Sequence, residues 1–289
     1  MSYGAYNLQC VDCHIPVFRA GTFPVQSIIP SFNLTQSGIQ NITTDAFTVL
    51  PKLNYLYLQH NLIFSIEKDA FATLQQLYEL NLGHNQLGRL TPGIFNGINS
   101  VSIMLDHNLI KEIPENAFVG VKGIMAFNIS FNRIGVLHAQ SFKGLTNLEI
   151  LDLQHNKICY IPLGIFKYLD VLKDLNLKGN KLRSFVPGTF SGLKNLLSIN
   201  LANNNFQKYY FIMANYKAEQ ERLQRLMEKC VISENEEEIW DDDSDEGEHD
   251  ILDTEIHDTD IEQEISDTEN EECRLNGSDF YFGIWGLTT

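Results

Sequence analysis

Histidines and acids recur at nearly even spacing through the middle of the chain. The histidines are His60, His84, His107 and His155. Phe131 takes the equivalent place between the last two. Acids recur beside them at Glu79, Asp106, Asp152 and Asp174. Imidazole groups that stand in a row can sense pH or bind a metal ion.

A second reactive pair lies near the start of the chain, where Cys10 and Cys13 form a Cys-x-x-Cys motif. Such a pair indicates redox chemistry or a zinc site mainly when a second pair of ligands accompanies it. None does, so we interpret these cysteines as a structural pair or as two buried thiols. The sequence also shows no catalytic motif in a suitable context: we find no Ser-His-Asp set, no paired carboxylates and no glycine-rich phosphate loop. We therefore expect no enzyme activity and no cofactor.

A repeat carries these residues. An asparagine recurs at steps of 24, 23, 24, 24, 24 and 24 residues, as Asn61, Asn85, Asn108, Asn132, Asn156, Asn180 and Asn204. A phenylalanine stands ten residues after most of them, as Phe71, Phe95, Phe118, Phe142, Phe166 and Phe190. Two degenerate units precede, marked by Ser37 and Phe47 and by Cys13 and Phe23. A period of this length predicts a solenoid, because one unit cannot bury its apolar face alone.

Each recurring residue has a physical role. Leu151 and Leu153 alternate with polar neighbours, so we expect them to point inward from one strand of a parallel sheet. The asparagine amide can donate to and accept from the turn backbone of the neighbouring coil, which predicts a ladder. Loss of Asn156 should leave backbone groups unpaired, at about 1–3 kcal/mol. Truncating one phenylalanine of the column should cost about 3–5 kcal/mol.

The pattern LxxLxLxxNxLxxIxxxxFxxL over residues 8–206 resembles the typical 24-residue leucine-rich repeats of extracellular receptors, adhesion proteins and matrix proteins of animals. The resemblance implies an α/β repeat solenoid. This is a leucine-rich-repeat horseshoe with a parallel β-sheet on its concave face, followed here by a C-terminal helix and an acidic disordered tail. Histidine is frequent before the asparagine in this repeat class. We therefore expect the histidines to be structural and expect no metal site.

Five segments follow from these patterns. They are an N-terminal cap with a degenerate repeat (residues 1–26), the solenoid (27–206), an amphipathic capping helix (207–233), an acidic disordered segment (234–272) and a short aromatic segment (273–289). Caps in the family have a cysteine at the place of Cys10 bonded to upstream cysteines, which this chain lacks. A dimerising coiled coil is the alternative for 207–233. A bridge between Cys230 and Cys273 is conceivable.

The net charge of −16 comes from one segment, because residues 234–272 hold 21 of the 37 acids and no Lys or Arg. Such a composition predicts disorder. One hypothesis is that this segment folds onto the lysine-rich half of the solenoid; the other is a solvated tail. The start MSYGAYNLQCVDCHIPVF does not read as a signal peptide, and no run of 18 apolar residues predicts a membrane span.

The concave face is where stacked repeats usually bind partners. Our candidate partner-binding residues are Tyr55, Tyr57, His60, Glu79, Asn81, His84, Asp106, His107, Phe131, Asp152, His155, Asp174 and Lys178. Four N-x-Ser/Thr sequons are candidate glycosylation sites, at Asn33, Asn41, Asn128 and Asn276.

We predict a non-enzymatic protein-binding module with a protein ligand and no nucleic acid. It would be extracellular or cell-surface associated, with a role in adhesion, receptor-type recognition or immune recognition. One alternative is an intracellular regulatory scaffold, cytoplasmic or nuclear, because acidic nuclear leucine-rich proteins have a similar layout. A third is a cation-binding matrix protein that acts through the acidic segment.

Overall fold

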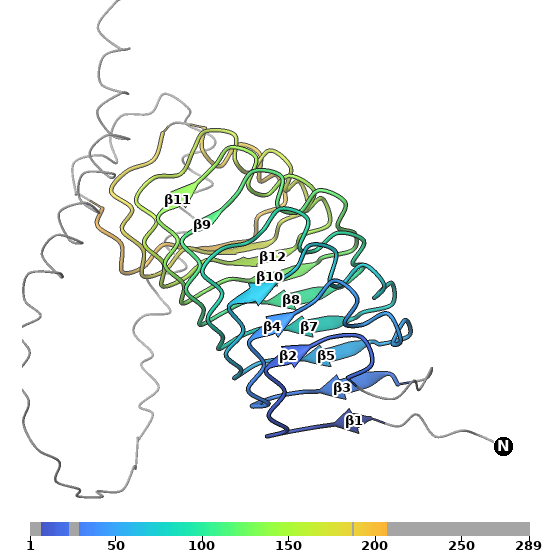
Figure 1. Ribbon diagram of the computed structural model, residues 1–289. Helices are drawn as coiled ribbons and strands as arrows, with labels where there is room; N and C mark the ends of the chain where they lie inside the picture. The colour runs from blue at the N-terminus through green and yellow to red at the C-terminus, as the bar shows by residue number, and fades with distance from the viewer. Residues whose placement is uncertain (1–6, 23–28, 187, 207–289) are drawn as a thin grey trace, which may run out of the picture. The chain divides into compact units, whose positions relative to one another are not determined.

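The computed structural model describes residues 7–22, 29–186 and 188–206, and these form a parallel β-solenoid. Its main sheet has nine strands in the order β1-β3-β5-β7-β8-β10-β12-β13-β14 (Figure 1). The strands are β1 (Leu8–Gln9), β3 (Ser31–Asn33), β5 (Tyr55–Tyr57), β7 (Glu79–Asn81), β8 (Ser102–Met104), β10 (Ala126–Asn128), β12 (Ile150–Asp152), β13 (Asp174–Asn176) and β14 (Ser198–Asn200).

Short strands on a second side of the coils form two further sheets. One sheet joins β2 (Val17–Phe18), β4 (Asn41–Ile42) and β6 (Ser65–Ile66), and the other joins β9 (Glu112–Ile113) and β11 (Val136–Leu137). The coil between β6 and β9 has no strand at residues 88–91. This side of the solenoid therefore has a gap between its two sheets, and the two described coils after β11 also lack a strand at the equivalent positions.

The described residues contain no helix, so the α component of the expected α/β class is not found there. Each coil instead returns through successive tight turns. In one coil the Thr43, Asp45 and Phe47 carbonyls accept hydrogen bonds from the N–H groups three residues further on, at 3.0–3.2 Å. A unit of about 24 residues leaves few residues to connect one strand of the main sheet to the next. Overlapping turns make this connection with fewer residues than a helix would need.

The core follows the predicted alternation. Leu151 and Leu153 are fully buried, whereas Ile150 is half exposed. The phenylalanine column is also confirmed, since ring centroids of stacked neighbours such as Phe71 and Phe95 lie 5.6–6.5 Å apart. These stacks join successive coils from Phe47 to Phe118 and from Phe142 to Phe190.

The asparagine ladder is confirmed as well. Asn156 Oδ1 accepts a hydrogen bond from the Ile134 N–H of the preceding coil (3.0 Å). Asn156 Nδ2 donates to the Ile129 carbonyl of that coil (3.0 Å) and to the Leu153 carbonyl of its own (3.1 Å). In the degenerate unit Ser37 takes part of this role, because its hydroxyl donates to the Cys10 carbonyl (2.7 Å). The side chain at this position therefore forms hydrogen bonds with buried backbone N–H and carbonyl groups that strand pairing leaves without a partner.

The one unit of 23 residues keeps its place in the sheet. Leu80 pairs with Ile103 and Asn81 with Met104, in the same register as the other strands. The residue is missing between Phe95 and β8, where Ser100 is buried and its hydroxyl donates to the Tyr78 (3.3 Å) and Ser102 (3.0 Å) carbonyls. The deletion is absorbed in the turn because the strand register fixes which side chains enter the core.

The first described coil continues the main sheet through pairing of Leu8 with Phe32. Cys10 and Cys13 are disulfide-bonded within this coil, with their Cα atoms 5.6 Å apart. Of the alternatives for these cysteines, the structure has the structural pair; Cys13 is exposed.

Several expectations fall outside the described residues. They are the place of Phe23, the capping helix at 207–233, the acidic segment at 234–272, the segment at 273–289 and the Cys230–Cys273 bridge. Within residues 7–22, 29–186 and 188–206, nothing helical has the length and apolar character needed to span a bilayer.

Candidate functional site

The main sheet turns one side away from the core, and we call this side the sheet face. It comprises the first and third residue of each strand and the two outward positions that follow it. Every candidate partner-binding residue of the solenoid lies there: Tyr55, Tyr57, His60, Glu79, Asn81, His84, Asp106, His107, Phe131, Asp152, His155, Asp174 and Lys178. The sequence register therefore placed all of them on one surface.

The recurring histidines form a continuous stack, which we call the ring ladder. Its members in order are His60, His84, His107, Phe131 and His155. Successive ring centroids are 4.1–4.6 Å apart, with interplanar angles of 9–19°. All five residues have left-handed backbone, with φ between 50° and 56°. This shared conformation turns each ring over the ring of the coil before it.

Gly179 ends the ring ladder. It has the same left-handed backbone, with φ of 67°, and a Cβ atom there would lie 2.7 Å from the Nδ1 atom of His155. The absent side chain therefore makes room for the His155 ring. Here the glycine is needed for space in addition to its conformational freedom.

Asp106 lies between two rings of the ladder. Its Oδ2 atom is 3.0 Å from His107 Nδ1 and 3.8 Å from His84 Nε2. Burial and the neighbouring His107 and His60 rings lower the pKa of His84, and the Asp106 carboxylate only partly opposes them. Two imidazoles thus face one carboxylate on an open surface.

The other acids are separate from this group. Burial raises the pKa of Glu79. Burial also raises the pKa of Asp152, against hydrogen bonds from the Gln154 N–H (2.9 Å) and Asn176. Asp174 is exposed at the start of β13. Among the described residues, His84, Asp106 and His107 form the one group of three or more ligand side chains close enough to share one ion.

Three tyrosines form an aromatic patch near the N-terminal end of the sheet face, at β5 and just before β7. The ring centroids of Tyr55 and Tyr57 are 6.4 Å apart, and Tyr78 packs 5.6 Å from Tyr55. Tyr78 is 52% exposed. Sequence reasoning missed it because it precedes β7 by one residue and so falls outside the alternating pattern. Glu79 borders this patch, and its charge adds to burial in raising the pKa of Tyr57.

Two sequons lie on the sheet face and share one local geometry. The Thr35 hydroxyl donates to Asn33 Oδ1 (2.6 Å), and the Ser130 hydroxyl donates to Asn128 Oδ1 (2.7 Å). Asn41 lies in β4, away from the sheet face. Asn276 falls outside the described residues.

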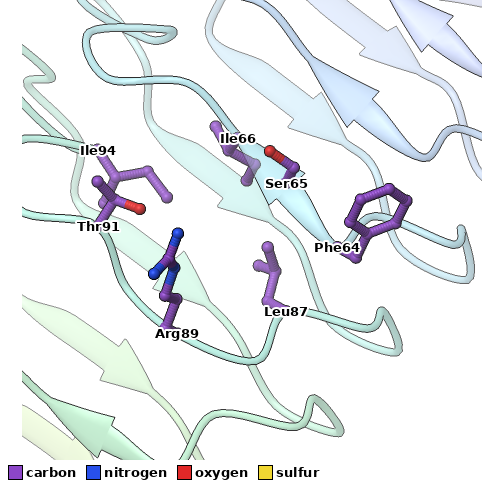
Figure 2. A pocket seen from close by; sticks show the side chains of 7 residues that line it. All are labelled: Phe64, Ser65, Ile66, Leu87, Arg89, Thr91 and Ile94. Carbon is purple, nitrogen blue, oxygen red and sulfur yellow. The ribbon is translucent and has the colours of Figure 1, made fainter.

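The interruption after β6 leaves a hollow of about 260 Å³ (Figure 2). Phe64, Ser65 and Ile66 line it from one coil, and Leu87, Arg89 and Thr91 line it from the next. Small-molecule sites usually occupy roughly 300–1,000 Å³. The hollow is smaller than this range, and the candidate site remains the sheet face.

A family model and a solved structure are similar to this chain. A family model described as leucine rich repeat matches residues 29–87, 51–104, 101–158 and 160–206. No curated protein matches the chain. A solved structure titled as a TLR13–ssRNA13 complex is similar, with 26% identity and a TM-score of 0.48, over 60% of this chain and 29% of that one. The chain thus spans less than a third of that protein's length. The matches of the repeat model, which together cover more than half of the chain, show that it belongs to the leucine-rich repeat family.

Proposed function

We propose that this protein is a non-enzymatic binding module that recognises a protein partner through its sheet face. The observation that carries this proposal is the aromatic patch of Tyr55, Tyr57 and Tyr78 beside Glu79. Exposed aromatic side chains that cluster on a rigid surface are enriched in the energetic centres of protein interfaces. A stacked-repeat sheet supplies the rigid support, because each strand is fixed by its neighbours.

The patch also suggests which side chain a partner inserts. Burial of Glu79 disfavours its charged form, as the raised pKa of its carboxyl reflects. A lysine or arginine from a partner would offset this penalty, and the neighbouring tyrosine rings would add cation–π attraction of about 0.5–2 kcal/mol. We therefore propose a basic side chain as the anchor of the partner.

Selection from a random peptide display library against the full chain tests this proposal. Selected peptides should be enriched in Lys or Arg, and the Tyr57→Ala and Glu79→Gln variants should bind them at least tenfold more weakly, about 1.4 kcal/mol. Tyr168→Ala is the matched control, because Tyr168 is half-buried and lies outside the sheet face. Peptides without basic residues, or equal binding by all variants, would refute the proposed anchor.

We also propose that the protein works outside the cell or at its surface. The Cys10–Cys13 disulfide supports this location, since disulfides persist in oxidising compartments. The partly exposed sequons at Asn33, Asn41 and Asn128 support it too. The alternative remains an intracellular scaffold, favoured by the acidic segment at 234–272. Mass spectrometry of the natural product separates the two: N-glycans support the first, whereas phosphorylation without glycans contradicts it.

A further inference from the structure

The group of His84, Asp106 and His107 has the composition and spacing of a metal site. Its three donor atoms all lie within 4.8 Å of one another. The two closest pairs, both through Asp106 Oδ2, are 3.0 and 3.8 Å apart. Donor atoms of a tetrahedral zinc site with bonds of about 2.0–2.1 Å lie roughly 3.3 Å apart. The group can therefore surround one ion once side-chain movements bring all three donor atoms to this spacing.

Gly83 is the second observation that supports a site. A Cβ atom on Gly83 would come within 2.9 Å of Asp106 Oδ1 and 3.2 Å of Asn81 Oδ1. The Asp106 carboxylate can therefore lie across this coil only because residue 83 has no side chain. The backbone of Gly83 is not left-handed, so conformational freedom does not require glycine here. The room left by Gly83 lets the Asp106 carboxylate lie between the two imidazoles.

We propose that His84, Asp106 and His107 bind one zinc ion on the sheet face. Two imidazole nitrogens and one carboxylate oxygen match the ligand preferences of zinc and disfavour calcium and magnesium, which take oxygen ligands. Three protein ligands leave one coordination position open to water on the solvent side. From the sequence we expected no metal site, because histidine is frequent before the asparagine in this repeat class. The fold adds the carboxylate between two of the histidines.

Zinc binding must also change the ring ladder. The His84 and His107 rings are stacked with centroids 4.1 Å apart and planes 10° apart, so their nitrogen lone pairs lie in two separate, nearly parallel planes. A ligand nitrogen points its lone pair at the metal. The two rings therefore tilt toward the ion when it binds, and the stack between them opens. This gives the proposal a spectroscopic signature that a purely structural histidine would lack.

The test is titration of the full chain with Zn²⁺, followed by the histidine ring signals in NMR and by competition with a fluorescent zinc indicator. One equivalent should shift two histidine signals, and Ca²⁺ should leave them unchanged. His84→Asn, Asp106→Asn and His107→Asn should each weaken binding by at least about tenfold, since even outer-shell changes weaken metal sites by about 10–100-fold. Asparagine suits the left-handed positions, as Asn203 shows in the last coil.

Two further variants make the test specific. His155→Asn is the matched control, because it changes the same position of another coil, with φ of 50°, outside the proposed site. Gly83→Ala keeps all three ligands but displaces the Asp106 carboxylate, and it should also weaken binding about tenfold. All variants retain the acidic segment, so differences among them report the site alone.

Equal zinc affinity of the wild-type chain and Asp106→Asn would overturn the proposal, as would histidine signals that stay fixed at one equivalent of Zn²⁺. The site does not depend on the proposed function. Loss of zinc binding would leave peptide recognition at the aromatic patch unchanged, so the two ideas can fail separately.

Discussion

Replacing Asn156 by alanine tests the central structural claim, that side-chain amides hold the coils together. Asn156 is 6% exposed, and its Oδ1 atom is the acceptor for the buried Ile134 N–H. Without the Asn156 side chain this N–H has no hydrogen-bond partner, which should lower the free energy of unfolding by about 1–3 kcal/mol. The Ile129 and Leu153 carbonyls each lose one bond, at about 0.5–1.5 kcal/mol, but both keep a bond from a neighbouring ladder asparagine. The expected loss of stability is about 2–6 kcal/mol.

Urea unfolding followed by circular dichroism measures this loss, provided that the dependence on urea concentration stays the same in both proteins. Asn147→Ala is the control. Asn147 is exposed on the same coil and contacts only the Thr146 hydroxyl, at 3.5 Å, among the interactions described for it. If Asn156→Ala and Asn147→Ala unfold at the same urea midpoint, the asparagine ladder does not stabilise the buried backbone groups between the strands, and the reasoning is refuted.

Three other changes give distinct outcomes. Phe142→Ala should cost about 3–5 kcal/mol in urea unfolding, because the ring is fully buried in the aromatic stack. Gly179→Ala should cost about 1–2 kcal/mol, since it combines left-handed backbone with a clash against His155, whereas Gly135→Ala, which faces open space, should not destabilise. Asp152→Asn should stabilise the protein at pH 7, because burial raises the pKa of this carboxyl in the folded state, so its contribution to stability falls as pH rises through that pKa. The gain should disappear below about pH 4, near the unfolded value, and unfolding at pH 7 and pH 3.5 checks it.

The sequence by itself determined the solenoid. Evenly spaced asparagines and phenylalanines fix which residues enter the core, and a parallel sheet in register then follows, because any slip would turn the strand leucines toward water. The sheet face followed for the same reason. The 23-residue unit did not disturb it, since the missing residue falls in a turn.

The tertiary structure decided what the sheet face contains. Tyr78 joined the aromatic patch because its ring packs on Tyr55 of the preceding coil, a contact between residues 23 positions apart. Asp106 reached His84 of the preceding coil across the space that Gly83 leaves open. The repeat pattern predicts which coil positions are neighbours. It does not predict which way a side chain turns within a column, because that direction depends on backbone dihedrals and on the room left by the adjacent coil.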